Sequence, residues 1–163
     1  MLDDLVVRIL AEDGDDAALR HVGLGMLLAT AHNQSRDAMN GELRALGVDV
    51  RGLSMLLALE LYGPSSQRRL IDLSGIDKST MVRIVDELEE GGLVRRERAP
   101  QDRRAYSITL TPDGERTLAS ARRIAADAGE RLFGWLGPGE RDQFVGLLRR
   151  LAEHTANYPQ RNG

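Results

Sequence analysis

The chain has 163 residues, a mass of 18.0 kDa and a formal net charge of −3 at pH 7. This length suffices for one domain, or for one small domain with an appended assembly element, and it excludes a large buried catalytic cleft. Because 42% of the residues are hydrophobic and 29% are charged, we expect a folded globular protein with loose termini rather than a disordered chain.

The first 16 residues form an acidic segment. Six acids oppose Arg8, so the segment carries −5 and the rest of the chain about +2. This segment is either a helix that extends a dimer interface, through Leu2, Leu5, Val6, Ile9 and Leu10, or a frayed tail. The sequence contains no run of signal-peptide or membrane-span length, so we expect a cytoplasmic protein without membrane contact.

Three helices are predicted over residues 17–46, 52–62 and 67–73. Gly47 ends the first helix, and Gly63-Pro64 ends the second, whose closely spaced leucines indicate burial over much of its circumference. Ser66 is expected to cap the third helix, which has Leu70, Ile71 and Leu73 on its apolar side. Only about three residues separate that helix from the next, as a helix-turn-helix requires.

The helix predicted over residues 78–90 is the most informative element. Asp77 is its expected N-cap, and an apolar stripe at helical spacing should face the core: Met81, Ile84, Val85 and Leu88. The residues outside that stripe include small hydroxyls and cations, which suit phosphates and base edges in a major groove: Lys78, Ser79, Thr80, Val82 and Arg83. A solvated helix face is the alternative, but the short turn before the helix and the basic hairpin after it favour DNA binding.

Two strands, 93–98 and 105–110, are predicted to form that hairpin. Its arginines and one aspartate are the candidate contacts: Arg95, Arg96, Arg98, Asp102, Arg103 and Arg104. Residues 94–104 carry a net +3, and a narrow minor groove attracts an inserted guanidinium, for which Arg103 is the candidate. We expect Asp102 to orient Arg104 by a charge-assisted pair, the alternative being an exposed turn aspartate of little consequence.

Two further helices complete the chain. Thr111-Pro112-Asp113 is a strong helix start, and the helix should continue to about Trp135. Gly137-Pro138-Gly139 interrupts it, and an amphipathic helix then runs to about Asn157. Because the apolar residues of the terminal helices lack sufficient partners within one small subunit, the sequence predicts a homodimer.

The run from Ser79 to Val94, with Asp102-Arg103-Arg104-Ala105 and Leu110-Thr111-Pro112-Asp113-Gly114, resembles the MarR family of bacterial transcription regulators. The order of helices matches over residues 17–157. The resemblance implies a homodimer whose terminal helices interlock and whose two winged domains read a pseudo-palindromic operator in double-stranded DNA, often as a repressor of a nearby gene. Two residues depart from the family pattern: Val82 replaces a small hydroxyl, and Glu87 a residue that is often basic.

The expected fold is therefore mainly α with a small β wing, a winged helix-turn-helix joined to a helical dimerisation region. The division by role is an acidic extension (1–16), a dimerisation region (17–47 and 111–157), a DNA-binding domain (48–110) and a loose tail (158–163). Many members of the family respond to small anionic or phenolic ligands. Residues suited to such a ligand here are His32, Arg36, Met39, Met55 and Tyr62, although core packing is the commoner role of such methionines.

Other classes of protein have less support in the sequence. There is no cysteine, which excludes disulfides, thiolate metal sites and thiol-based oxidant sensing, and the three histidines are scattered. No phosphate-binding loop is present, so we expect neither an enzyme nor a cofactor. A winged-helix protein-interaction module that does not bind DNA is the alternative, kept open by Asp86, Glu87, Glu89 and Glu90.

Overall fold

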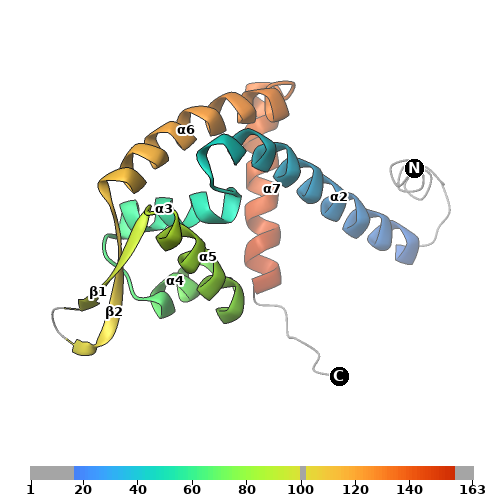
Figure 1. Ribbon diagram of the computed structural model, residues 1–163. Helices are drawn as coiled ribbons and strands as arrows, with labels where there is room; N and C mark the ends of the chain where they lie inside the picture. The colour runs from blue at the N-terminus through green and yellow to red at the C-terminus, as the bar shows by residue number, and fades with distance from the viewer. Residues whose placement is uncertain (1–16, 100–101, 157–163) are drawn as a thin grey trace. The chain divides into compact units, whose positions relative to one another are not determined.

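The computed structural model describes the backbone of residues 17–99 and 102–156 and the side chains of 18–98 and 106–156. The chain divides into two compact units, Met1–Ala126 and Asp127–Gly163 (Figure 1). The acidic segment and the C-terminal tail lie outside the described residues, so both readings of the segment remain open. The predicted division of the chain by role also stays a prediction.

The first unit begins with α2 (Ala17–Leu43), which continues into a 3-10 turn, η1 (Arg44–Leu46), and ends at Gly47 as predicted. Next comes α3 (Val50–Tyr62), two residues longer at its start than predicted because the Asp49 carboxylate accepts a hydrogen bond from the Gly52 amide at 2.7 Å. The short α4 (Gln67–Ser74) has the expected cap, in which the Ser66 hydroxyl accepts from the Arg69 amide. Leu73 was expected on its apolar side but is exposed.

α5 (Lys78–Glu90) packs its apolar stripe into the core of this unit. All four predicted residues, Met81, Ile84, Val85 and Leu88, are at most 5% exposed. They lie in one cluster with residues of α3, α4 and the wing, including Leu56, Leu70 and Ile108. The opposite face of α5 is thereby left toward solvent.

The wing is an antiparallel hairpin of β1 (Val94–Ala99) and β2 (Asp102–Leu110). Val94 pairs with Leu110 and Arg98 with Tyr106, with an irregularity between Arg98 and Ala99. The sheet extends closer to the tip than the predicted strands. Ser65 adds a further bridge, since its amide and carbonyl both bond with Ile108, at 3.1 and 2.9 Å. This bridge attaches the wing to the segment between α3 and α4.

The start of α6 (Pro112–Phe133) is fastened to the first residues of the wing. The Thr111 hydroxyl donates to the Gly92 carbonyl at 2.6 Å and accepts from the Gly114 amide at 3.0 Å, the predicted N-cap. Gly114 is buried so closely that a Cβ there would lie 2.0 Å from the Leu93 carbonyl oxygen. Only glycine permits this approach of helix and strand.

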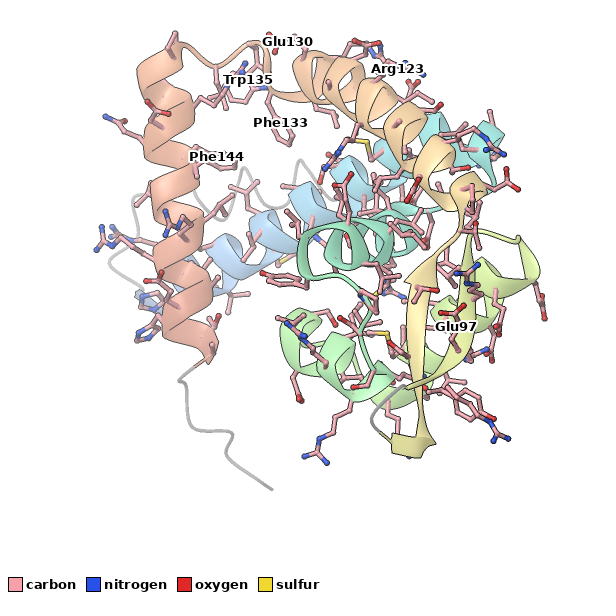
Figure 2. The ribbon with its side chains drawn as sticks, turned by 90° about the vertical axis from the view of Figure 1, so that its left-hand side faces the viewer. Glu97, Arg123, Glu130, Phe133, Trp135 and Phe144 are labelled. Atoms are coloured by element: carbon pink, nitrogen blue, oxygen red, sulfur yellow. The ribbon has the colours of Figure 1, made fainter. Side chains whose placement is uncertain are left out.

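The second unit contains the end of α6 and α7 (Pro138–Ala156). Aromatic side chains gather at the corner between the two helices, where Phe133 ends α6, Trp135 lies in the turn and Phe144 lies on α7 (Figure 2). All three are exposed, as are four other apolar side chains of α7: Val145, Leu147, Leu148 and Leu151. None of the described helices is both long enough and apolar enough to cross a membrane.

Candidate nucleic-acid interface

The first turn of α5 presents small polar groups to solvent. The Asp77 carboxylate caps the helix by accepting from the Thr80 amide at 3.0 Å, and it also accepts a hydrogen bond from the Ser79 hydroxyl. These bonds, the one from Ser79 above all, hold the pKa of the Asp77 carboxyl well below its ordinary value. Asp77 is therefore ionised at neutral pH, and its carboxylate orients the Ser79 hydroxyl.

The exposed face of α5 also carries Lys78, Val82 and Arg83, as predicted. Arg83 is not free. Its Nη1 donates to the Glu87 Oε1 at 2.6 Å, one helical turn later, and both side chains are about half exposed, at 53 and 55%. Lys78, Ser79, Val82 and Arg83 are thus exposed, with the acid Glu87 among them, whereas the predicted contact Thr80 is half-buried. Their contact with DNA stays a prediction.

Arg96 has a different position from the other arginines of the wing. Its guanidinium pairs with both Asp86 and Glu89 of α5, its amide donates to Glu89 at 2.9 Å, and its side chain is only 27% exposed. Burial by itself would lower the pKa of Arg96, but the hydrogen bonds and charges of the two acids outweigh it and the net shift is upward. Arg96 therefore links the wing to α5, a role that the sequence prediction of a DNA contact did not include.

The rest of β1 carries exposed charges. Arg95 Nε lies 2.7 Å from Glu97 Oε1, and the side chain of Glu97 projects from the strand (Figure 2). Arg98 is exposed closer to the tip of the hairpin. The predicted tip residues Asp102, Arg103 and Arg104 lie at the start of β2, but their side chains are outside the described residues, so the minor-groove role of Arg103 and the Asp102–Arg104 pair stay predictions.

The five residues suggested for a ligand have different surroundings within the single chain. Met55 is buried in the core and Met39 packs against it, whereas Arg36 pairs with the adjacent Asp37 at 3.4 Å. His32 is exposed on α2, and the Tyr62 ring lies 5.8 Å from the Arg69 guanidinium carbon. The ligand role of these residues stays a prediction, and the packing of the two methionines agrees with the simpler core reading.

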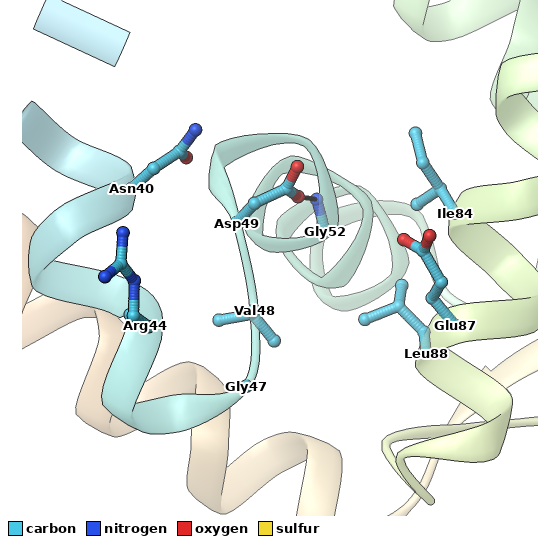
Figure 3. A pocket seen from close by; sticks show the side chains of 9 residues that line it. All are labelled: Asn40, Arg44, Gly47, Val48, Asp49, Gly52, Ile84, Glu87 and Leu88. Carbon is cyan, nitrogen blue, oxygen red and sulfur yellow. Dashed lines mark hydrogen bonds between the residues drawn. The ribbon is translucent and has the colours of Figure 1, made fainter. Parts of the chain in front are cut away.

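A cavity of about 360 Å³ lies elsewhere in the first unit, between the end of α2, the start of α3 and α5 (Figure 3). Its walls carry the side chains of Asn40, Arg44, Val48, Asp49, Ile84, Glu87 and Leu88. The Asn40 side-chain oxygen accepts from the Val50 amide at 2.9 Å, so part of this polar lining is already used by the fold. None of the five suggested ligand residues lines this cavity.

Sequence reasoning missed the pairing of the acids on α5. Asp86 and Glu89 were both counted among the acids that keep a protein partner open, yet both are held by Arg96. Their spacing of three residues on one helix, with arginines on the following strand, was the available signal. Within the described part of the chain, no three His, Cys, Asp or Glu side chains are grouped to hold a metal ion.

A model of the MarR family matches residues 46–105, which cover α3, α4, α5 and most of the wing. The putative transcriptional regulatory protein for the hcr operon of Thauera aromatica is 34% identical to this chain, over 66% of each. The chain spans slightly less than two thirds of the length of the curated relatives that it matches.

Two solved structures extend the match to most of the chain. The transcriptional repressor CouR, bound to a 23-mer DNA duplex, is 30% identical, with a TM-score of 0.75, over 79% of this chain and 92% of CouR. BpsR of Bordetella bronchiseptica, whose DNA binding is regulated by 6-hydroxynicotinic acid, is 27% identical, with a TM-score of 0.73, over 78% and 91%. From the family match, the helix-turn-helix with its wing and these relatives, the chain belongs to the MarR family of transcriptional regulators.

Proposed function

We propose that the protein is a homodimeric repressor that binds a pseudo-palindromic operator near its own gene. The observation that carries this proposal is the separation of α5 into two faces, one buried in the core and one exposing Lys78, Val82 and Arg83 beside a basic wing. Such a helix enters the major groove while the wing contacts the backbone or the adjacent minor groove. CouR, a repressor bound to duplex DNA, supports the same mode here.

Dimerisation is proposed from the apolar residues that one subunit leaves uncovered. On α2 they are Leu19, Val22, Leu24, Leu27 and Leu28, and on α7 they include Phe144, Leu147 and Leu151. Water-exposed apolar surface of this extent is unfavourable in a monomer. A second copy that covers it would place two α5 helices on successive turns of one duplex, which is the reason for expecting a pseudo-palindrome.

Ligand control is part of the same proposal. We propose that a small anionic or phenolic molecule releases the dimer from DNA. BpsR supports this idea because its DNA binding is regulated by 6-hydroxynicotinic acid, a hydroxylated aromatic acid. The family is one of transcriptional regulators, and we propose no catalytic role.

The test is fluorescence anisotropy of the full-length protein on labelled duplex DNA from its own upstream region, with scrambled competitor and two salt concentrations. We expect binding that resists competitor and weakens as salt rises, because phosphate contacts release counterions. Hydroxylated aromatic acids titrated into the preformed complex should lower the anisotropy again.

If the upstream duplex shows no preference over scrambled DNA, site selection from random duplexes is the second arm of the same test. Failure to enrich any sequence there would reject DNA recognition. In that event the protein-interaction module that the sequence left open would replace it.

A further inference from the structure

Glu87 is an acid on the face of α5 that is proposed to meet DNA. Two other acids of this helix, Asp86 and Glu89, have a structural partner, since both pair with Arg96 of the wing. Glu87 pairs instead with Arg83, an exposed residue of the reading face. A carboxylate in this place lowers the attraction between the protein and the DNA backbone, so its effect on binding requires a separate explanation.

The ion pair itself adds little to the stability of the fold. Exposed pairs at this helical spacing contribute little because water screens them, and both side chains here are about half exposed. Arg44 also lines the cavity that Glu87 lines, but these two described residues form no hydrogen bond or ion pair with each other (Figure 3). The effect of Glu87 is therefore to be sought in how it changes Arg83 rather than in the folding energy.

The geometry of the pair leaves one edge of the guanidinium open. Glu87 accepts a hydrogen bond from Nη1 of Arg83, whereas Nε and Nη2 of Arg83 donate to no atom within the described part of the chain. Nε and Nη2 carry two parallel N–H donors, which is the arrangement that binds O6 and N7 of a guanine. A phosphate that approached the same guanidinium would meet the charge of Glu87 close by, whereas a neutral base edge would meet it at lower cost.

We propose that Glu87 determines specificity by positioning Arg83: it holds the guanidinium with its Nε–Nη2 edge toward a guanine and disfavours contact with phosphates. This inference rests on the proposed DNA-binding function. Phosphates are present in every sequence and supply nearly all of non-specific affinity, so keeping the Arg83 guanidinium away from them weakens binding to random DNA more than binding to the operator. Glu87 thus lowers affinity for the wrong sequences, and it is a repulsive element in the recognition surface.

The test compares Glu87→Gln with Glu90→Gln in the full-length protein. Both substitutions remove one negative charge from α5 at an exposed position, but only Glu87 bonds Arg83. Dissociation constants are measured by anisotropy on the best selected duplex and on a scrambled duplex, at three salt concentrations. For Glu87→Gln we expect binding to scrambled DNA to tighten roughly two- to fivefold more than binding to the selected duplex, and the salt slope on scrambled DNA to steepen by about 0.9.

Glu90→Gln should instead tighten binding to both duplexes by a similar factor. The ratio of the dissociation constant on scrambled DNA to that on the selected duplex should then stay unchanged. The inference is overturned if Glu87→Gln leaves the ratio as it is in the wild type, or if Glu90→Gln lowers it equally. The pair is then tested in the Arg83→Ala background, where Glu87→Gln should have no further effect on the ratio. A further decrease there would mean that Glu87 does not act through Arg83, which also rejects the proposal.

These outcomes are separate from a failure of the proposed function. A wild-type protein that prefers no duplex removes both proposals together. One that prefers a duplex, with the same preference in Glu87→Gln, removes only the inference about Glu87. Circular dichroism and urea unfolding of each variant check that the substitution leaves the fold intact, as we expect at exposed positions.

Discussion

At the scale of single residues, Gly114 fixes how closely α6 approaches β1. A Cβ at this position would lie 2.0 Å from the Leu93 carbonyl oxygen and 3.3 Å from the side chain of Leu110. The clash is with backbone, which cannot rotate away as the end of a flexible side chain does. The hydrogen bonds of Thr111 on either side hold the same two segments together.

We therefore expect Gly114→Ala to lower the free energy of unfolding by roughly 1–3 kcal/mol, the usual cost of overpacking. Urea unfolding followed by circular dichroism, at equal protomer concentration, measures this change. Gly41→Ala is the matched control, because a Cβ there meets no atom within 4 Å and alanine favours a helix by roughly 1 kcal/mol over glycine. Equal stability of wild type and Gly114→Ala would show that the helix start shifts without cost.

At the scale of elements, the joint between α5 and the wing depends on Arg96. Its guanidinium pairs with two acids of α5 and its amide donates to Glu89, whereas the side chain of the neighbouring Arg95 pairs, among the described residues, with the exposed Glu97 on the same strand. Hydrogen bonds to charged groups contribute about 1.5–3 kcal/mol when they are shielded, and partial exposure reduces this value. The two arginines are adjacent in sequence, but the side chain of Arg96 joins β1 to α5, whereas that of Arg95 pairs within β1.

Arg96→Ala should loosen the wing while α3 and the buried side of α5 stay folded. We expect amide hydrogen exchange in β1 and β2 to quicken by roughly tenfold, which corresponds to about 1.4 kcal/mol of local opening. Arg95→Ala serves as the control and should leave these rates within about twofold, since its pair is exposed. Unchanged exchange in both variants would mean that the Ser65 bridge and the core packing of Ile108 hold the wing without Arg96.

The sequence predicted the elements well and the relations between polar groups less well. The stripe of α5 and the caps of Ser66, Asp77 and Thr111 were correct because they depend on local spacing and on bonds within a few residues. The pairing of Arg96 with Asp86 and Glu89 joins different elements. The three-residue spacing of the two acids indicated a shared partner, but it did not identify which arginine of the wing that partner is. The prediction that Leu73 faces the core was wrong, because a helix of eight residues makes too few turns to bury every apolar side chain on one side.

At the scale of the whole molecule, the uncovered apolar residues of α2 and α7 predict a stable dimer. Sedimentation velocity at micromolar concentration should give twice the mass of 18.0 kDa. Leu151→Glu should shift the protein toward monomer and weaken operator binding, because a charge in an apolar contact is not compensated there.

Arg149→Glu is the control for this substitution. It places the same side chain about 200° around the helix from residue 151, away from the apolar stripe. This variant should remain a dimer. A wild-type protein that sediments as a monomer would contradict the assembly, and with it the expectation of a pseudo-palindromic operator.

The link from Arg96 to α5 also limits which DNA the wing and α5 of one protomer can contact together. Because the guanidinium bridges the wing to α5, we expect the two elements to move together rather than independently. In the proposed complex, the distance between the base pairs that each element contacts is then set by the protein and is not adjusted to the DNA. Inserting one base pair between those two positions turns them by roughly a tenth of a helical turn relative to each other, and an independently mobile wing would tolerate that shift where this one would not.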